Sequence, residues 1–144
     1  MQPILHLSIP VRDLEEARAF YVDVLGCEAA RARLGYQDFW FYGLQLTLHD
    51  RPGEVTTPPE GGVRHFGVTL GREDFDALLA RATAHGVHWV APVTTDDEGA
   101  STEQTKAKLA DPSGNVIEIK TYVDVASALE FSPHSYPHAA EHGN

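Results

Sequence analysis

Two stretches of the chain decide its fold: His6-Leu7-Ser8-Ile9-Pro10-Val11 and His65-Phe66-Gly67-Val68-Thr69-Leu70. In both, apolar and polar residues alternate with a period of two. That pattern is typical of a strand with one face against a core and the other face open. We therefore expect strands over residues 4–11 and 64–70.

A helix and three more strands are expected after each of these two strands. Apolar residues at three- and four-residue spacing predict helices over residues 14–25 and 73–85. The further strands are expected over residues 28–33, 37–42 and 44–49 in the first half, and over residues 87–90, 105–110 and 115–122 in the second half. A polar loop is expected over residues 96–104. Each half therefore reads as strand, helix and three strands, which is an internal repeat with a period of about 60 residues.

The length and the repeat together predict the domain organisation. The chain has 144 residues, of which 42% are hydrophobic and 22% charged, a composition typical of one globular domain. We expect a single α+β domain over residues 1–125, built from two βαβββ modules that form a curled mixed sheet around a cleft. The two modules are expected at about residues 3–50 and 63–122, joined by a linker over residues 51–62. Residues 126–144 are expected to form a flexible C-terminal tail.

Charge and cysteine content exclude several classes of function. The formal net charge is −10, so a nucleic-acid partner is not expected. No apolar run approaches the ~20 residues of a membrane helix, and residues 1–7 do not have the pattern of a secretory signal. The single cysteine, Cys27, excludes an internal disulfide and a cysteine-based zinc site. We expect a cytoplasmic protein.

The repeat places three metal-binding side chains at matching positions. His6 lies 20 residues before Gly26, and His65 lies 21 residues before Gly86. Glu118 occupies the place that Thr47 holds in the first half. If the polar faces of these strands converge, two imidazoles and one carboxylate form a facial metal site with open positions for ligands. Such a set favours Fe(II), Mn, Zn, Ni or Co over calcium.

A simpler interpretation exists for each of these residues taken alone. A histidine in a strand usually lies at the surface or makes a hydrogen bond, and a strand glutamate usually faces solvent. Independent surface residues have no reason to fall on matching faces of two repeats, so the repeat favours the metal site. For Lys106 and Lys108 two interpretations remain: they neutralise an anionic substrate, or they lie on a solvated strand edge.

The sequence resembles the vicinal oxygen chelate superfamily over about residues 3–125. The resemblance lies in the stretch from His6 to Cys27, in His65-Phe-Gly-Val-Thr-Leu, and in Asp111-Pro-Ser-Gly-Asn-Val-Ile-Glu118-Ile. That superfamily includes glyoxalase I, bleomycin-resistance proteins, fosfomycin-resistance thiol transferases and extradiol dioxygenases. Within it, the chain is most similar to small bacterial proteins described as extradiol-dioxygenase-like. The resemblance implies the glyoxalase/dioxygenase fold, and it places metal ligands at His6, His65 and Glu118.

The resemblance also indicates which reactions the sequence disfavours. Glyoxalase I usually has a glutamate ligand at the position of Thr47, so glyoxalase I activity is not expected. The larger dioxygenases carry a tyrosine about ten residues before the ligand glutamate, and here that stretch is Lys106-Ala107-Lys108. A different acid or base would then be required. Three candidates are His49, Tyr122 and Lys108, although His49 could equally be exposed at its strand end.

Three functional hypotheses follow. The first is an Fe(II) extradiol-type dioxygenase acting on a small aromatic substrate with vicinal oxygens. The second is a lyase, isomerase or thiol transferase that uses the same ligands with Mn, Ni, Co or Zn. The third is a non-enzymatic resistance protein that binds an antibiotic. The resemblance also implies a homodimer, and the sequence does not decide whether one chain or two build each site.

Overall fold

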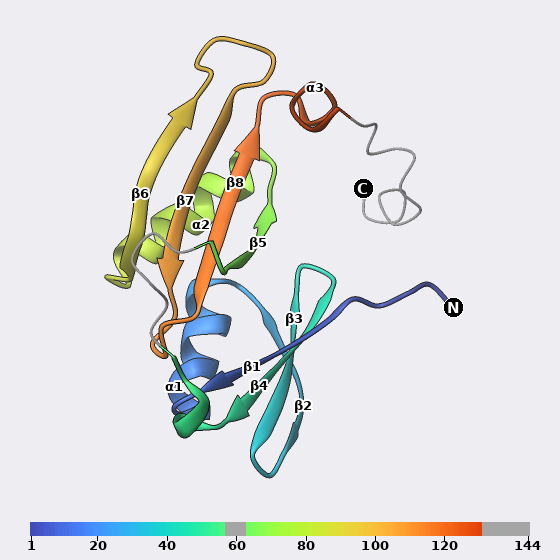
Figure 1. Ribbon diagram of the computed structural model, residues 1–144, viewed down its shortest axis with the longest axis vertical. Helices are drawn as coiled ribbons and strands as arrows, with labels where there is room; N and C mark the ends of the chain where they lie inside the picture. Colours follow the sequence, from blue (N-terminus) through green and yellow to red (C-terminus); the bar gives the residue numbers. More distant parts are fainter. Residues whose placement is uncertain (57–62, 131–144) are drawn as a thin grey trace.

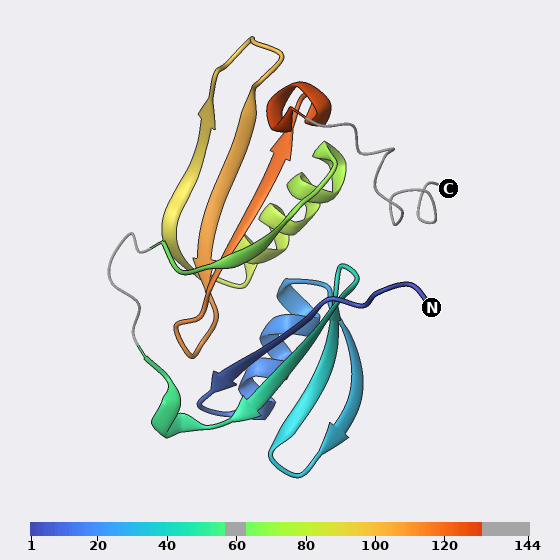
Figure 2. The ribbon, with the colours of Figure 1, turned by 45° about the vertical axis from the view of Figure 1, so that its right-hand side comes forward.

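The computed structural model describes residues 1–56 and 63–130, which form two four-stranded sheets (Figures 1 and 2). The N-terminal sheet has the strand order β1-β4-β3-β2. Its strands are β1 (His6–Val11), β2 (Glu28–Arg33), β3 (Tyr36–Phe41) and β4 (Leu44–Asp50). The hairpin between β3 and β4 turns at Tyr42 and Gly43, both with positive φ, as a two-residue hairpin requires.

The C-terminal sheet repeats this arrangement with the order β5-β8-β7-β6. Its strands are β5 (Phe66–Thr69), β6 (His88–Asp96), β7 (Gln104–Ala110) and β8 (Val116–Tyr122). The first strand of each half pairs in parallel with the last strand of the same half, and the other pairs are antiparallel. This confirms the predicted α+β class and the mixed sheets. The eight strands form two sheets, with the parallel pairs β1–β4 and β5–β8 at one edge of each.

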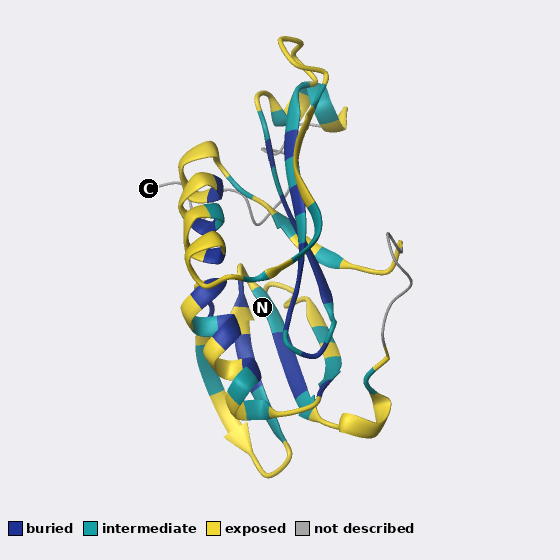
Figure 3. Ribbon diagram, turned by 90° about the vertical axis from the view of Figure 1, so that its left-hand side faces the viewer, coloured by how far each residue is buried: buried dark blue, intermediate teal, exposed yellow. Residues whose placement is uncertain are grey.

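Each sheet has one face covered by a helix. Asp13 accepts a hydrogen bond from the Glu16 N–H and so caps α1 (Leu14–Ala19), which continues as the π-helical turn η1 (Phe20–Val24). The predicted helix over residues 14–25 is therefore present, with a wider final turn. In the second half, α2 (Arg72–Ala84) buries Phe75, Leu78 and Ala82 against the sheet, while its other side is exposed (Figure 3).

Strand β6 is longer than expected. The sequence predicts a strand over residues 87–90 and a loop from Asp96, but β6 pairs with β7 as far as Asp96 opposite Gln104. Hydrophobic alternation could not reveal its second half, because residues 92–95 are exposed and two register shifts interrupt the pairing. The expected polar loop is thus confined to the residues between the ends of β6 and β7.

One hydrophobic core joins the two halves. Buried residues of α1, η1, β3, β4, α2, β7 and β8 form a single cluster, and Phe41 contacts Phe66 edge-on with ring centroids 5.4 Å apart. Polar contacts tie the turn before β8 to the first half: Tyr21 donates to Asp111 at 2.9 Å, and Asn115 donates to the Pro10 carbonyl at 3.0 Å. Burial raises the pKa of Asp111, and the hydrogen bonds from Asn115 and Tyr21 offset part of that effect.

Short segments flank the two modules. The turn η2 (Pro52–Glu54) follows β4, and residues 57–62 of the predicted linker lie outside the described residues. After β8, the helix α3 (Val125–Leu129) occupies the start of the predicted tail; residues 131–144, which carry three histidines, are outside the described part. No helix in residues 1–56 and 63–130 is long and apolar enough to cross a membrane.

Candidate metal site

Glu118 lies on the open face of the C-terminal sheet, opposite the face that α2 covers. In β8 its neighbours Ile117 and Ile119 point into the core, so the alternation of the strand directs Glu118 to the other side. Although this face is open, the Glu118 side chain is almost fully buried, with 9% of it exposed, because neighbouring side chains surround it. The strand pairing places Lys108 of β7 on one side of Glu118 and Gly67 of β5 on the other.

His65 and Glu118 meet directly. The Nε2 atom of His65 lies 2.6 Å from Oε2 of Glu118, and the histidine side chain is 25% exposed. His65 immediately precedes β5, two residues before Gly67, which is opposite Glu118, and the parallel pairing of β5 with β8 brings its side chain within reach of the carboxylate. An imidazole nitrogen and a carboxylate oxygen, aimed at one another at a partly open surface, are two donors that suit a divalent transition metal.

Gly67 makes this close approach possible. It lies opposite Glu118 in the β5–β8 ladder, and a Cβ atom built on it would overlap the backbone carbonyl oxygen of Glu118. Only a residue without a side chain allows the two backbones to lie so near each other. The sequence placed Gly67 on the polar face but gave no reason for a glycine there, because the close approach arises only when β5 and β8 pair.

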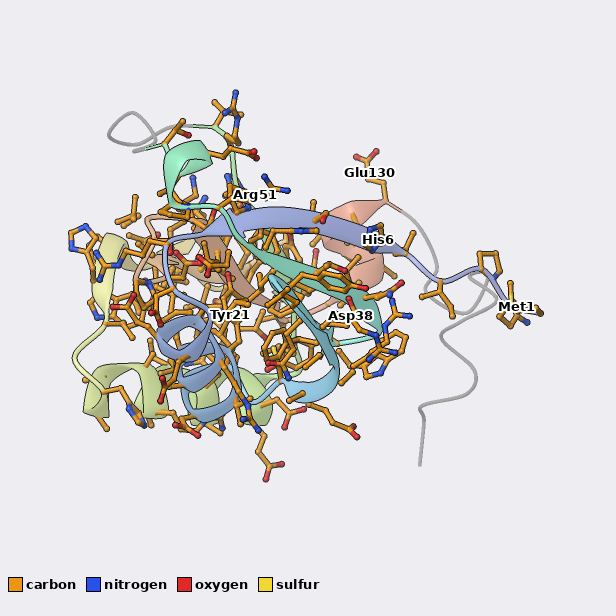
Figure 4. All side chains as sticks on the ribbon, turned by 90° about the horizontal axis from the view of Figure 1, so that it is seen from below. Met1, His6, Tyr21, Asp38, Arg51 and Glu130 are labelled. Atoms are coloured by element: carbon orange, nitrogen blue, oxygen red, sulfur yellow. The ribbon has the colours of Figure 1, made fainter. Side chains whose placement is uncertain are left out.

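His6 occupies the equivalent place in the first half. Ser8 is paired with Thr47 as Gly67 is paired with Glu118, so His6 and His65 match, as do Thr47 and Glu118. His6 is exposed, and its Nδ1 lies 3.2 Å from the Gln45 carbonyl oxygen (Figure 4). If Nδ1 carries the proton, it donates to this carbonyl and leaves Nε2 free to bind a metal, a common arrangement in metal sites.

The structure brings His65 and Glu118 together but does not add His6 to them. Within residues 1–56 and 63–130, no three His, Cys, Asp or Glu side chains are grouped so that they could hold a metal ion. The two matching polar faces belong to separate sheets of the same chain. One chain therefore supplies a pair of donors on its C-terminal sheet and a single donor on its N-terminal sheet.

The three acid–base candidates lie at different distances from the proposed metal ligands. Lys108 is directly opposite Glu118 in the β7–β8 ladder, which makes it the nearest of the three to the pair. Tyr122 is on the same face of β8 but four residues away, about 13 Å at the usual strand rise. His49 lies four residues beyond the position level with His6 and stacks against Tyr36, so it is equally remote from that histidine.

Asp38 is a buried carboxylate that sequence reasoning missed. It is 6% exposed and lies on the same face as Thr47, which donates a hydrogen bond to it at 2.7 Å. Gln45 also donates to it, at 3.4 Å, and Arg31 lies 3.4 Å away. The alternation of β3 indicates this placement. Because Phe39 and Phe41 face the core, the even-numbered Asp38 faces the opposite side of the sheet.

Phe39 and Phe41 are in the core. Burial raises the pKa of the Cys27 thiol to about 12, which leaves it protonated and without nucleophilic character at neutral pH.

A groove of about 830 Å³ adjoins His65. It runs between β1 and the start of β5 and has largely apolar walls, among them Leu7, Ile9 and Phe66.

The match with known proteins agrees with this fold. Residues 3–119 match the Glyoxalase/Bleomycin resistance protein/Dioxygenase superfamily. The chain belongs to this family. A glyoxalase/bleomycin resistance protein/dioxygenase from Alicyclobacillus acidocaldarius is 36% identical, with a TM-score of 0.75 over 85% of this chain and 92% of that one.

Two further relatives are named for resistance or transfer functions. The glutathione transferase FosA of Serratia marcescens is 28% identical over 128 residues, which cover 83% of this chain and 80% of that protein. The fosfomycin resistance protein FosX of Listeria monocytogenes is 16% identical and shares the fold, with a TM-score of 0.73 over 89% of this chain and 98% of that one. The family membership confirms the resemblance; the relatives named here do not single out a dioxygenase.

We predict that Gly67→Ala disrupts the β5–β8 pairing, because the added methyl group overlaps the Glu118 backbone. The free energy of unfolding should fall by about 3 kcal/mol or more, as expected for a steric clash at a tight backbone contact. Denaturant unfolding of the purified variant measures this loss. Gly53→Ala is the matched control, since a Cβ atom at Gly53 meets nothing within 4 Å. Equal stabilities for the two variants would contradict the role given to Gly67.

Proposed function

We propose that the protein is a metal-dependent enzyme in which His65 and Glu118 of one chain and His6 of a second chain hold a divalent metal. The observation that carries this proposal is the 2.6 Å approach of His65 Nε2 to Glu118 Oε2 on a partly open sheet face. Membership of a family whose name covers glyoxalases and dioxygenases supports it. The matching position of His6 supplies the third donor, its Nε2, when Nδ1 carries the proton and donates to the Gln45 carbonyl.

A second chain is needed because one chain leaves His6 apart from the other two donors. In a symmetric dimer, the open face of each N-terminal sheet would cover the open face of the partner's C-terminal sheet. Each dimer would then hold two equivalent sites, and each site would combine residues of both chains. The exposed His6 and the half-buried groups around Glu118 are the two surfaces that such pairing joins.

The reaction proposed is extradiol-type cleavage of a small aromatic substrate with two neighbouring oxygens, with Fe(II) as the favoured metal. When bound, the metal would act as a Lewis acid and hold the substrate oxygens and O₂ in place. Lys108, directly opposite Glu118, is the side chain best placed to give or take a proton at a substrate oxygen. Tyr122 and His49 are the alternatives, and both lie farther along their strands.

A thiol transfer reaction is the second candidate. It is favoured by the similarity to a protein named as a glutathione transferase, which extends over 83% of this chain. It would use the same three ligands, with Mn, Zn, Ni or Co as alternative metals. A lyase or isomerase would need the same site. These candidates differ from the dioxygenase in one respect that can be measured: none of them consumes O₂.

We expect Glu118→Gln to remove most of the bound metal, because an amide oxygen binds a divalent metal far more weakly than a carboxylate does. Elemental analysis of protein purified without oxygen should give about one metal per chain for the original sequence, and at least tenfold less for the variant. The matched control is Glu73→Gln, which makes the same change at an exposed position in the first turn of α2. Unchanged metal content in Glu118→Gln would contradict the ligand assignment, and so would tight ligand binding by metal-free protein.

A mixing experiment tests whether two chains build each site. His6→Ala and His65→Ala should each lose metal when alone. If the ligands come from different chains, a mixed dimer regains one intact site, and random exchange of equal amounts restores about a quarter of all sites. Metal content before and after subunit exchange measures this recovery. A site built within one chain gives no recovery, because every chain then lacks one of its own ligands.

Oxygen dependence separates the two reaction classes. A dioxygenase should consume one O₂ per substrate molecule and stop under nitrogen, because O₂ is its second substrate. An oxygen electrode measures this with catechol-type substrates and Fe(II)-loaded protein. The Glu118→Gln protein under the same conditions is the control for free iron. Turnover that continues unchanged without O₂ would contradict the dioxygenase and favour the transferase or lyase.

A further inference from the structure

All three lysines of the chain lie on one face of one sheet. The sequence has eleven Lys and Arg residues, and only Lys106, Lys108 and Lys120 are lysines. In the β7–β8 ladder Lys106 is opposite Lys120, and Lys108 is opposite Glu118, so the three surround the carboxylate proposed to bind metal. The residues between them, such as Ala107 and Ile119, belong to the hydrophobic core. The helix α2 covers that side of the sheet (Figure 1).

This gathering of positive charge is unfavourable for the sheet itself. Two like charges directly opposite each other on neighbouring strands destabilise the pair. Lysines often protect the edge of a sheet against aggregation, but β7 and β8 are the two central strands in the order β5-β8-β7-β6. The edge explanation, which the sequence left open for Lys106 and Lys108, therefore does not apply.

Only one of the three lysines has a carboxylate partner among the described residues. The Lys106 Nζ lies 2.6 Å from Asp96 Oδ2, and this hydrogen bond raises the pKa of Lys106. Lys108 and Lys120 form no ion pair within residues 1–56 and 63–130, although both are half-buried. Two ammonium groups thus lie on the open face beside the His65–Glu118 pair, without an ion-pair partner in the described part of the chain.

The buried carboxylate of the opposing polar face already has partners of its own. In the proposed dimer the buried carboxylate of that face is Asp38, and Thr47, Gln45 and Arg31 already bind it. On the lysine face Asp96 and Glu118 offset two of the three positive charges. A divalent metal at Glu118 would then leave the pocket strongly positive, in a chain whose net charge is −10.

We propose that the substrate of this site is an organic acid, whose carboxylate is bound by Lys108 and Lys120 while its neighbouring oxygens face the metal. This inference rests on the proposed function, because it takes the His65–Glu118 pair as part of the site. It adds the charge of the substrate, which the family resemblance and the named relatives leave open. It also makes Lys108 and Lys120 the residues that select acids over neutral compounds of the same shape. With Lys108 bound to the substrate carboxylate, proton transfer would pass to one of the alternatives, Tyr122 or His49.

The test compares an acid with a neutral compound of nearly the same shape. The probes are 3,4-dihydroxybenzoate and 3,4-dihydroxybenzamide, which share the two ring oxygens and differ in the charge of the third group. Their binding to Fe(II)-loaded protein under nitrogen is measured by titration calorimetry, so that no turnover occurs. Two charged contacts of ordinary strength should favour the acid about 100-fold.

Three variants locate the preference. Lys108→Met and Lys120→Met should each lower the acid-to-amide ratio about tenfold, because each removes one ammonium group and keeps most of the apolar side chain. Arg18→Met is the matched control: it removes one positive charge from an exposed position of α1, and its ratio should equal that of the original protein. The iron content of every sample is measured beside the titration.

The outcomes separate this inference from the proposed function. An acid preference that falls in both lysine variants, and not in Arg18→Met, supports the inference. Equal binding of acid and amide by iron-loaded protein overturns it and leaves the metal site intact. A preference that survives in both lysine variants also overturns it. If the original protein binds no metal, the proposed function itself fails, and the iron measurement shows this independently of the titration.

Discussion

The close approach of β5 and β8 is the constraint on which the candidate site depends. These strands are far apart in the sequence, and their parallel pairing brings the carboxylate of Glu118 within 2.6 Å of His65. Gly67 permits that pairing, since any side chain there would overlap the Glu118 backbone. The ladder also aligns Lys108 with the same carboxylate from the other side. One backbone contact thus sets the positions of a histidine, a carboxylate and a lysine.

The two halves share a backbone plan but have diverged in chemistry. Where the second half has Glu118 and Lys108, the first has Thr47 and Asp38, which bind each other through a 2.7 Å hydrogen bond. Of the three proposed ligands, the first half therefore carries His6, whereas the second carries the pair His65 and Glu118 together with Lys108 and Lys120. Each half carries only part of the ligand set, so the proposed metal site requires the polar face of both sheets. These two faces do not meet within one chain, and a second copy of the chain is therefore needed.

Elements with a strong hydrophobic pattern were predicted well. Both helices and the central strands follow from apolar periodicity, because their buried faces are filled by core residues such as Phe39 and Leu78. The second half of β6 was missed, since exposed residues show no alternation and only its pairing with β7 makes it a strand. The π-helical end of α1 was missed as well, because the number of residues in a helical turn leaves little trace in the pattern of apolar positions.

The amino-acid pattern alone reveals the repeat, the equivalence of His6 with His65 and of Thr47 with Glu118, and the strand face on which each of these residues lies. It could do so because strand alternation and glycine positions are local properties of the chain. Only the tertiary structure decided which of these residues meet. His65 reaches Glu118 through a long-range strand pairing, while His6 remains on a separate sheet. Distances between strands depend on pairing and packing across the whole chain, and no local pattern records them.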